Sequence, residues 1–264
     1  PIERIEEFTK LVAQFTATTD VSVEKSATAF GRLDQLIEGV DGQYQKLGSS
    51  ILQVGTNSVA TESEIIAISQ QIASVANSAR FSADEVFGLS AALASLGTAP
   101  ELSRGVIVRL FTKIDQAVSD GGETLELFGQ TARMTGAEFA EAWGKDTSKA
   151  LESCLSGLGQ MDQTAGAATA QMKALGIEGS RDIPTIKKLA QNTDLLNSAM
   201  ADAKQGWDDG TELQRQYSII SSTVSEKLVV LGNNFQALIA NIGASSGAIG
   251  GLIDVGIGLI QVFD

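Results

Sequence analysis

Hydrophobic positions recur at helical spacing along most of the chain. In the first part, apolar residues three and four positions apart run up to a break near residues 18–20: Ile5, Phe8, Val12 and Phe15. This spacing places side chains on one face of an α-helix. No window shows the sustained alternation and turn dipeptides of a β-hairpin. The pattern therefore predicts an all-α fold, a small multi-helix globule flanked by long amphipathic, coiled-coil-like helices.

After the break the spacing becomes regular, with alternating steps of three and four through Phe30, Leu33, Ile37, Val40, Tyr44, Leu47 and Ile51. Such a/d spacing lets helices pair along their length, although Gly42 and Gly48 each weaken a helix by roughly 1 kcal/mol relative to Ala. We expect residues 1–58 to form amphipathic and heptad helices, and we expect an oligomer seam through Phe30, Leu33, Ile37, Val40, Tyr44 and Leu47. The alternative is an amphipathic helix that packs on the core of its own domain.

The middle of the chain, residues 59–205, predicts a compact helical core domain built from short helices. Four sequences of the capping-box type mark helix starts: Thr61–Glu64, Ser82–Glu85, Thr98–Glu101 and Thr135–Glu138. Glycines that alternate with these starts indicate helix ends: Gly97, Gly121, Gly122, Gly144, Gly159 and Gly176.

The last part of the chain predicts a long amphipathic helix over residues 206–242, followed by a glycine-rich hydrophobic helix over residues 243–264. Residues 242–260 form an apolar window close to the roughly 20 residues that span a bilayer. Gly243, Gly247 and Gly251 repeat at the spacing that lets membrane helices approach closely. Asp254 opposes insertion, because a charge within the window costs several kcal/mol, and Ile257 is where a tryptophan would report depth. The alternative is a helix buried against copies of itself or other proteins.

The charge balance narrows the possible partners. The net charge is −13, with 19 basic residues spread among 32 acidic ones and no basic cluster. Specific binding to a phosphate backbone needs clustered Lys and Arg, so we expect no specific nucleic-acid binding. The acidic surface would either let DNA slide past or simply keep the protein soluble.

Candidate chemistry is sparse. The chain has no histidine, which excludes Ser-His and Cys-His nucleophiles and the commonest metal ligand. The single cysteine, Cys154, lies on an amphipathic pattern that is typical of a small buried residue. Two carboxylate pairs have helical spacing, Glu123 with Glu126 and Glu138 with Glu141, but acids in a first turn favour the helix dipole. We therefore expect no catalytic site, no cofactor and no metal.

Three blocks of sequence, in order, resemble the core region of tail tape-measure proteins from long-tailed bacteriophages. The first block is residues 89–104, a helix ending in Leu96-Gly97 followed by a capped helix with an arginine. The second block joins residues 135–143 to residues 150–158. The third block is residues 174–182, followed by the helix around residues 186–190. Each block alone is only a capped amphipathic helix, whereas the ordered set, covering roughly residues 60–205, is more specific.

The resemblance implies a structural role in the virion. It implies a fragment of a tape measure that sets tail length, lies in the tail tube and tip, and leaves ahead of the genome. The implied partners are other copies of the chain, with three copies as our estimate, the tail-tube and tail-tip or baseplate hub proteins, tail assembly chaperones, and the host membrane during ejection. The implied locations are the virion tail, the host cytoplasm during assembly and the host envelope on ejection. The alternative function is a pore-forming or membrane-perturbing helical protein.

Overall fold

In the computed structural model, which describes residues 2–40, 42–161 and 166–221, these residues form helices and no strand. The all-α prediction is confirmed. The helices, in chain order, are α1 (Ile2–Thr18), α2 (Val23–Leu36), α3 (Tyr44–Thr56), α4 (Glu62–Ser78), α5 (Ala83–Ser95), α6 (Pro100–Asp120), α7 (Gly122–Thr131), α8 (Gly136–Lys145), α9 (Thr147–Met161), α10 (Ala167–Ala174), α11 (Asp182–Gln191), α12 (Thr193–Asp209) and α13 (Glu212–Ser221).

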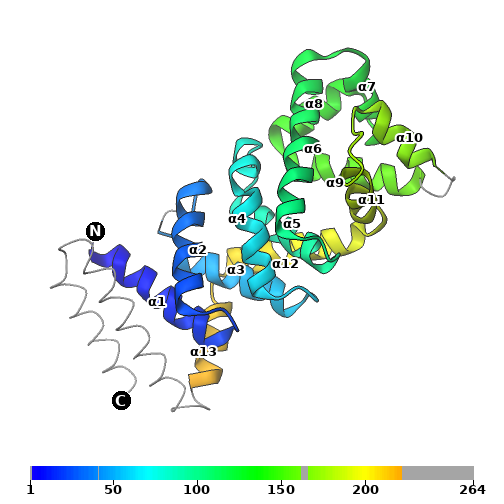
Figure 1. Cartoon of the computed structure of the whole chain (residues 1–264). Coiled ribbons are helices and arrows are strands. Elements are labelled where there is room, and N and C mark those ends of the chain that lie inside the picture. The colour runs from blue at the N-terminus through cyan, green and yellow to red at the C-terminus, as the bar shows by residue number, and fades with distance from the viewer. Residues whose placement is uncertain (1, 41, 162–165, 222–264) are drawn as a thin grey trace.

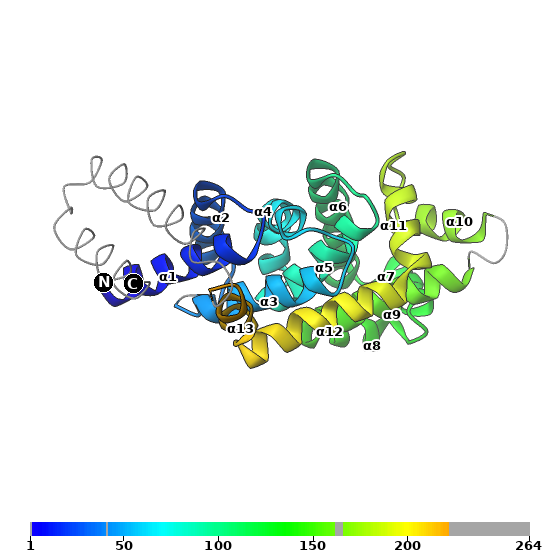
Figure 2. The ribbon, with the colours of Figure 1, turned by 90° about the horizontal axis from the view of Figure 1, so that it is seen from below.

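The helices are arranged along an elongated body (Figure 1). One end holds α1, α2 and α13, and the other end holds α7 to α11 around the long helix α6. Helices α4 and α5 lie between these ends, and α12 runs underneath along α3 and α5 (Figure 2). A helix from late in the sequence therefore connects regions formed by the beginning and the middle of the chain.

Helix starts follow the predicted capping boxes at three of four places. The Thr61 backbone N–H donates to the Glu64 carboxylate at 2.9 Å, and the Glu64 N–H donates to the Thr61 hydroxyl at 3.2 Å. Thr135 and Glu138 repeat this geometry at the start of α8. At the start of α5, the Ser82 N–H donates to Glu85 at 2.8 Å. Each reciprocal pair satisfies backbone donors that the first turn leaves free.

The fourth predicted capping box, Thr98 to Glu101, is wrong. The N-cap of α6 is Ala99, without a side-chain cap, and Pro100 occupies the first turn. Proline is suited to the first helical position because its fixed φ is helical and its missing N–H has no intrahelical partner there. Helix α6 therefore starts from proline rather than from a hydroxyl.

Glycines end the helices at some of the predicted positions. Gly97, Gly121 and Gly176 follow the ends of α5, α6 and α10 with φ between 70° and 77°, the left-handed region that favours glycine, whereas Gly122, with φ 71°, is the first residue of α7. Gly144 and Gly159 are not helix ends, because α8 and α9 continue through them. A Cβ at Gly159 would lie 2.1 Å from the Ala190 carbonyl oxygen, so this glycine serves the close approach of α11 instead.

The predicted heptad helix is interrupted, and in this respect the sequence prediction is wrong. Helix α2 ends at Leu36, Ile37 is extended with φ −111° and ψ 120°, and α3 begins at Tyr44. Gly39 and Gly42 in the connection have φ of 84° and 72°, values that a continuous helix excludes. The regular spacing therefore belongs to two helices that bury their faces in the same core.

The predicted helix over residues 206–242 is also interrupted where it is described. Helix α12 extends through residue 206 to Asp209, and Gly210 closes it in the left-handed conformation with φ 61°. Helix α13 then covers Glu212–Ser221. The remainder of that prediction, residues 222–242, lies outside the described residues.

One hydrophobic core runs through the described body, from Leu11 in α1 to Leu213 in α13. Ser50 of α3 donates its hydroxyl to the Ala203 carbonyl of α12 at 2.7 Å. Helix α12 contacts α3, which precedes the predicted boundary at residues 58–59, and α5, which follows it. The two sides of the predicted boundary are therefore joined through α12.

Candidate functional site

The predicted seam residues lie inside the chain's own core. Phe30, Leu33, Val40 and Leu47 have no exposed surface, and Ile37 and Tyr44 are 2% and 5% exposed. Phe30 packs edge-on against Phe15 of α1, with ring centroids 4.9 Å apart. These side chains are therefore covered within one copy, as the intrachain alternative expected, and self-association of the chain stays a prediction.

The predicted membrane or packing segment, with Gly243, Gly247, Gly251, Asp254 and Ile257, lies outside the described residues. Among the helices that are described, none combines the length and the apolar character that crossing a membrane requires.

Three of the four carboxylates considered for catalysis, Glu126, Glu138 and Glu141, form hydrogen bonds or ion pairs within α8 or between α7 and α8. Glu138 caps α8, and hydrogen bonds from Thr135 lower the pKa of its carboxyl. Glu141 pairs with Lys145 one turn later, at 2.6 Å, which lowers the pKa of Glu141. Glu126 accepts a hydrogen bond from the Gly136 N–H at 3.1 Å. These contacts are local and stabilise the α7–α8 hairpin.

Cys154 is buried, as predicted, with 2% of its surface exposed. Burial raises the pKa of its thiol to about 12, so the reactive thiolate is scarce at neutral pH. Within the described ranges no group of His, Cys, Asp and Glu has the arrangement of a metal site.

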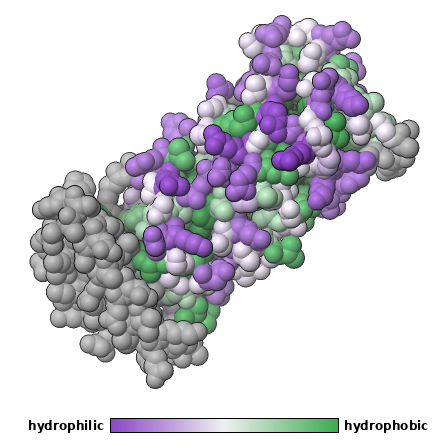
Figure 3. Space-filling model, viewed as in Figure 1, coloured by the Kyte–Doolittle hydropathy of each residue, from purple (hydrophilic) through white to green (hydrophobic). Residues whose placement is uncertain are grey.

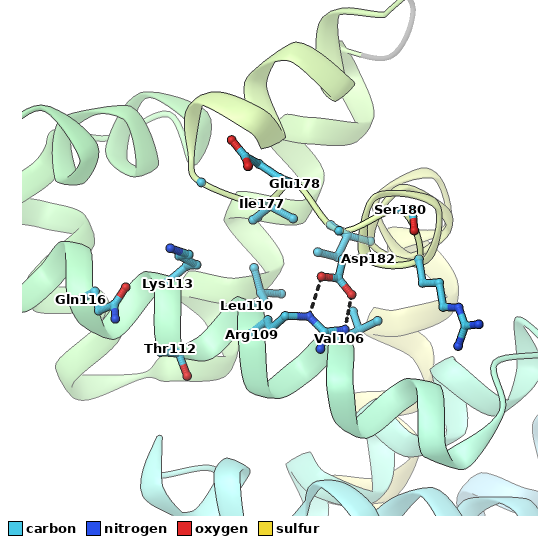
Figure 4. A pocket seen from close by; sticks show the side chains of 14 residues that line it. Val106, Arg109, Leu110, Thr112, Lys113, Gln116, Ile177, Glu178, Ser180 and Asp182 are labelled. Atoms are coloured by element: carbon cyan, nitrogen blue, oxygen red, sulfur yellow. Dashed lines mark hydrogen bonds and ion pairs between the residues drawn. The ribbon is translucent and has the colours of Figure 1, made fainter.

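A cleft of about 520 Å³ lies between α6 and the segment that connects α10 to α11, and we call it the α6–α11 cleft. Its apolar lining comes from both sides, from Val106 and Leu110 on α6 and from Ile177 and Ile186 opposite. Its size is within the range of about 300–1,000 Å³ that is usual for ligand clefts. Figure 4 shows the charged side chains at its edge.

A buried carboxylate closes one end of this cleft. Asp182 begins α11, and its side chain is only 4% exposed. The Arg109 guanidinium donates to both carboxylate oxygens, with Nε to Oδ2 at 2.6 Å and a second bond from the terminal nitrogen to Oδ1. Such a bidentate pair fixes orientation as well as adding energy, and the hydrogen bond to Asp182 raises the pKa of Arg109. The pair ties α6 to α11.

Glycines make room for this pair. A Cβ at Gly105 would lie 3.0 Å from the Arg109 guanidinium, and a Cβ at Gly179 would lie 2.1 Å from the Asp182 carboxylate. Sequence reasoning missed this contact, because Arg109 and Asp182 are 73 positions apart and no periodicity links them.

Two further cations lie at the rim of the α6–α11 cleft. Lys113 lies one helical turn beyond Arg109, with its aliphatic stem 3.5 Å from the position of a Cβ on Gly176, and Arg181 precedes Asp182. No ion pair joins Lys113 or Arg181 to another described residue. An apolar floor with free cations at its edge suits an apolar group that carries negative charge nearby.

Comparison with known protein families gives a match over most of the chain. A family described as phage-related minor tail protein matches residues 1–176, about two thirds of the chain. The chain belongs to this family. No curated protein matches, and no solved structure does.

This tail protein is therefore a component of phage tails, and a virion location follows from the family. The match covers the first two of the three sequence blocks and the helices from α1 to α10. It also covers the α6 side of the α6–α11 cleft, whereas the lining residues from Ile177 to Ile186 lie beyond it.

Proposed function

We propose that this tail protein is a segment of a tail tape-measure protein. In this proposal the segment helps to set tail length, occupies the tail tube near its tip, and leaves the virion ahead of the genome. Its role is structural and involves no catalysis. The observation that supports the proposal is that the three blocks resembling tape-measure proteins fold as one unit around α6.

Side-chain contacts join the three blocks through α6. Phe111 of α6 packs edge-on against Trp143 of the second block, with ring centroids 5.5 Å apart. Arg109 of α6 binds Asp182 at the end of the third block. Helix α6 starts within the first block, so one helix joins all three. The three blocks would thus occur together in one protein because they pack against each other in one folded unit.

The proposed partners follow from that role. They are the tube proteins around the segment, the tip or baseplate hub proteins at its end, assembly chaperones before the tube closes, and further copies of the same chain. The net charge of −13 supports passage of DNA through the same space, since a surface of the same sign as DNA does not retain it.

Measuring the length of the tail tests the proposal directly. In the phage or prophage that encodes this chain, residues 1–264 would be duplicated in frame and tails measured by electron microscopy. A helix extends about 1.5 Å per residue, so the duplication lengthens the tail by up to roughly 400 Å if the segment is drawn out, and by less if it stays compact. In the control, the second copy of the segment is placed after the stop codon of the gene, so that the DNA is equally long but the protein is unchanged. Tails of unchanged length in the translated duplication would contradict a measuring role.

The pore-forming alternative rests on the apolar window over residues 242–260. Dye release from liposomes by the purified chain alone, without phage components, would favour it. Asp254→Asn is the sensitive variant, because removing the charge lowers the cost of insertion. Under the structural proposal neither protein releases dye at neutral pH.

A further inference from the structure

The loop between α3 and α4 presents an exposed hydrophobic side chain. Val59 is 81% exposed, compared with 42% for Ile5 and 51% for Ile219, the other large hydrophobic residues exposed in the described part of the chain. On the face shown in Figure 3, hydrophobic areas lie between hydrophilic side chains. A single exposed valine is common, so the surroundings of Val59 decide whether it has a role.

The Val59 loop, residues 57–60, is held in place from both sides. The Asn57 side chain donates to the Asp202 carboxylate of α12 at 2.9 Å. The Ala60 N–H donates to the Ser58 hydroxyl at 3.2 Å, which closes a tight turn around Val59. A loop that is already ordered loses little entropy on binding. Val59 is therefore presented in a fixed position.

The charged residues close to the Val59 loop in sequence are all acidic. Residues 47–79 contain no Lys or Arg, whereas Glu62 and Glu64 follow the loop directly. Asp202 adds a third carboxylate through its bond to Asn57. The loop thus combines an apolar tip with an acidic base.

The α6–α11 cleft has the opposite character. The residues that line it include three basic side chains, Arg109, Lys113 and Arg181, and two acidic ones, Glu178 and Asp182. Because Arg109 is paired with Asp182, Lys113 and Arg181 remain against Glu178, so the lining is slightly positive in a chain whose net charge is −13. Its floor is apolar, and Lys113 and Arg181 are free of ion pairs with the described residues.

We propose that the Val59 loop of one copy docks into the α6–α11 cleft of a second copy. Val59 covers the apolar floor, and the carboxylates at the base of the loop face Lys113 and Arg181. Because the two surfaces are different parts of the molecule, each bound copy still offers a free loop and a free cleft. Contacts of this head-to-tail kind build rows of copies or closed rings rather than a symmetric pair. The proposal is independent of the tape-measure function.

Sedimentation velocity of the purified chain over a concentration series tests this contact. We expect weak association that strengthens with concentration and weakens as salt is raised, because charges contribute and the interface is small. Val59→Ser should weaken association at least about tenfold, which corresponds to about 1.4 kcal/mol of lost apolar burial. The matched control is Ile219→Ser, which removes an exposed hydrophobic residue on α13 and should leave association unchanged.

Mixing two variants tests the head-to-tail geometry. Val59→Ser keeps its cleft, and the double variant Lys113→Glu with Arg181→Glu keeps its loop. Each should be monomeric alone, whereas the equimolar mixture should form a dimer and nothing larger, since only one complementary contact is left. Circular dichroism would show that both variants keep the helical fold.

Three results would overturn the proposal. The first is a wild-type chain that stays monomeric up to about 1 mM, the weak end of specific binding. The second is association that Val59→Ser and Ile219→Ser reduce equally. The third is a variant mixture that remains monomeric, even if the cleft then binds another tail protein.

Discussion

Two regions of this tail protein are held together by different means. The terminal-helix region comprises α1, α3, α12 and α13, which meet through small residues and polar contacts. The aromatic region comprises α6 to α9 together with Phe81, and it is held by a chain of ring contacts. The first depends on how closely backbones approach, and the second depends on how much apolar volume is buried.

In the terminal-helix region, glutamines and serines bridge helices that are far apart in sequence. The Gln14 amide donates to Gln214 at 2.7 Å, and Gln45 donates to Gln14 at 3.0 Å. A Cβ at Gly206 of α12 would lie 2.6 Å from the Ser49 carbonyl oxygen of α3. Such close approach leaves no space for larger side chains, so shape decides which helices pair here.

In the aromatic region, five rings follow one another through the core. Phe81 contacts Phe111 at 5.2 Å, Phe111 contacts Trp143 at 5.5 Å, Trp143 contacts Phe139 at 6.4 Å, and Phe139 contacts Phe128 at 5.6 Å between centroids. Aromatic pairs of this kind add about 0.5–1.5 kcal/mol each beyond their area. The chain has only 5% aromatic residues, and this region concentrates several of them.

Separating the two regions should have the largest effect on the free energy of unfolding. A fragment of residues 59–205, which the sequence predicts to fold alone, lacks α3 and uncovers the side of α12 around Ala203. We expect it to be less stable than residues 1–221 by at least about 5 kcal/mol, as much as the whole stability of many small domains. Urea unfolding of both fragments, followed by circular dichroism, gives the comparison. Equal midpoints and slopes would show that the predicted domain boundary is real.

Within the aromatic region, Phe111→Ala should cost about 3–5 kcal/mol, because it empties a site between two rings in a fully buried position. Thermal and urea unfolding measure this change. A loss below about 1 kcal/mol would contradict the close packing of Phe111 between the two rings.

Within the terminal-helix region, Gly206→Ala should cost about 1–3 kcal/mol, since the added methyl group meets the backbone of α3 and α12 must move. Gly31→Ala in α2 is the matched control, because nothing lies within 4 Å of its Cβ position. That variant should instead gain about 1 kcal/mol from helix propensity. If both variants gain stability, the approach of α12 to α3 is looser than the structure shows.

The smallest effect concerns Glu152 on α9, within the aromatic region. Burial raises the pKa of its carboxyl, and Asp146 and Glu85 raise it further. A carboxyl with a raised pKa in the folded state destabilises at neutral pH, and this cost disappears as pH falls through that pKa. Glu152→Gln should therefore stabilise at pH 7 by less than about 1 kcal/mol, since solvent screens a half-buried group, and the gain should vanish below pH 4.5.

Melting temperatures at pH 7 and pH 4 measure the Glu152→Gln effect. Glu141→Gln is a control of opposite sign, because Lys145 lowers the pKa of Glu141 and neutralising it removes a favourable pair. A Glu152→Gln gain that is independent of pH would point to packing rather than charge.

The local features of this fold were largely determined by the sequence. Helical spacing, the capping boxes at Thr61, Ser82 and Thr135, and the left-handed glycine at Gly97 each depend on residues within one or two turns of each other. Local hydrogen bonds and backbone conformations are set by adjacent residues, so they can be predicted without knowing the partners of a helix.

The tertiary structure alone decided the features that join distant residues. The spacing from Phe30 to Ile51 fits one helix as well as two, and only packing of both faces into a common core favours the bend at Gly39 and Gly42. The pairing of Arg109 with Asp182, and with it the α6–α11 cleft, depends on where two helices meet in space. Hydrophobic periodicity predicts which face of a helix is buried. The helix that packs against this face is determined by shape and charge across the whole chain.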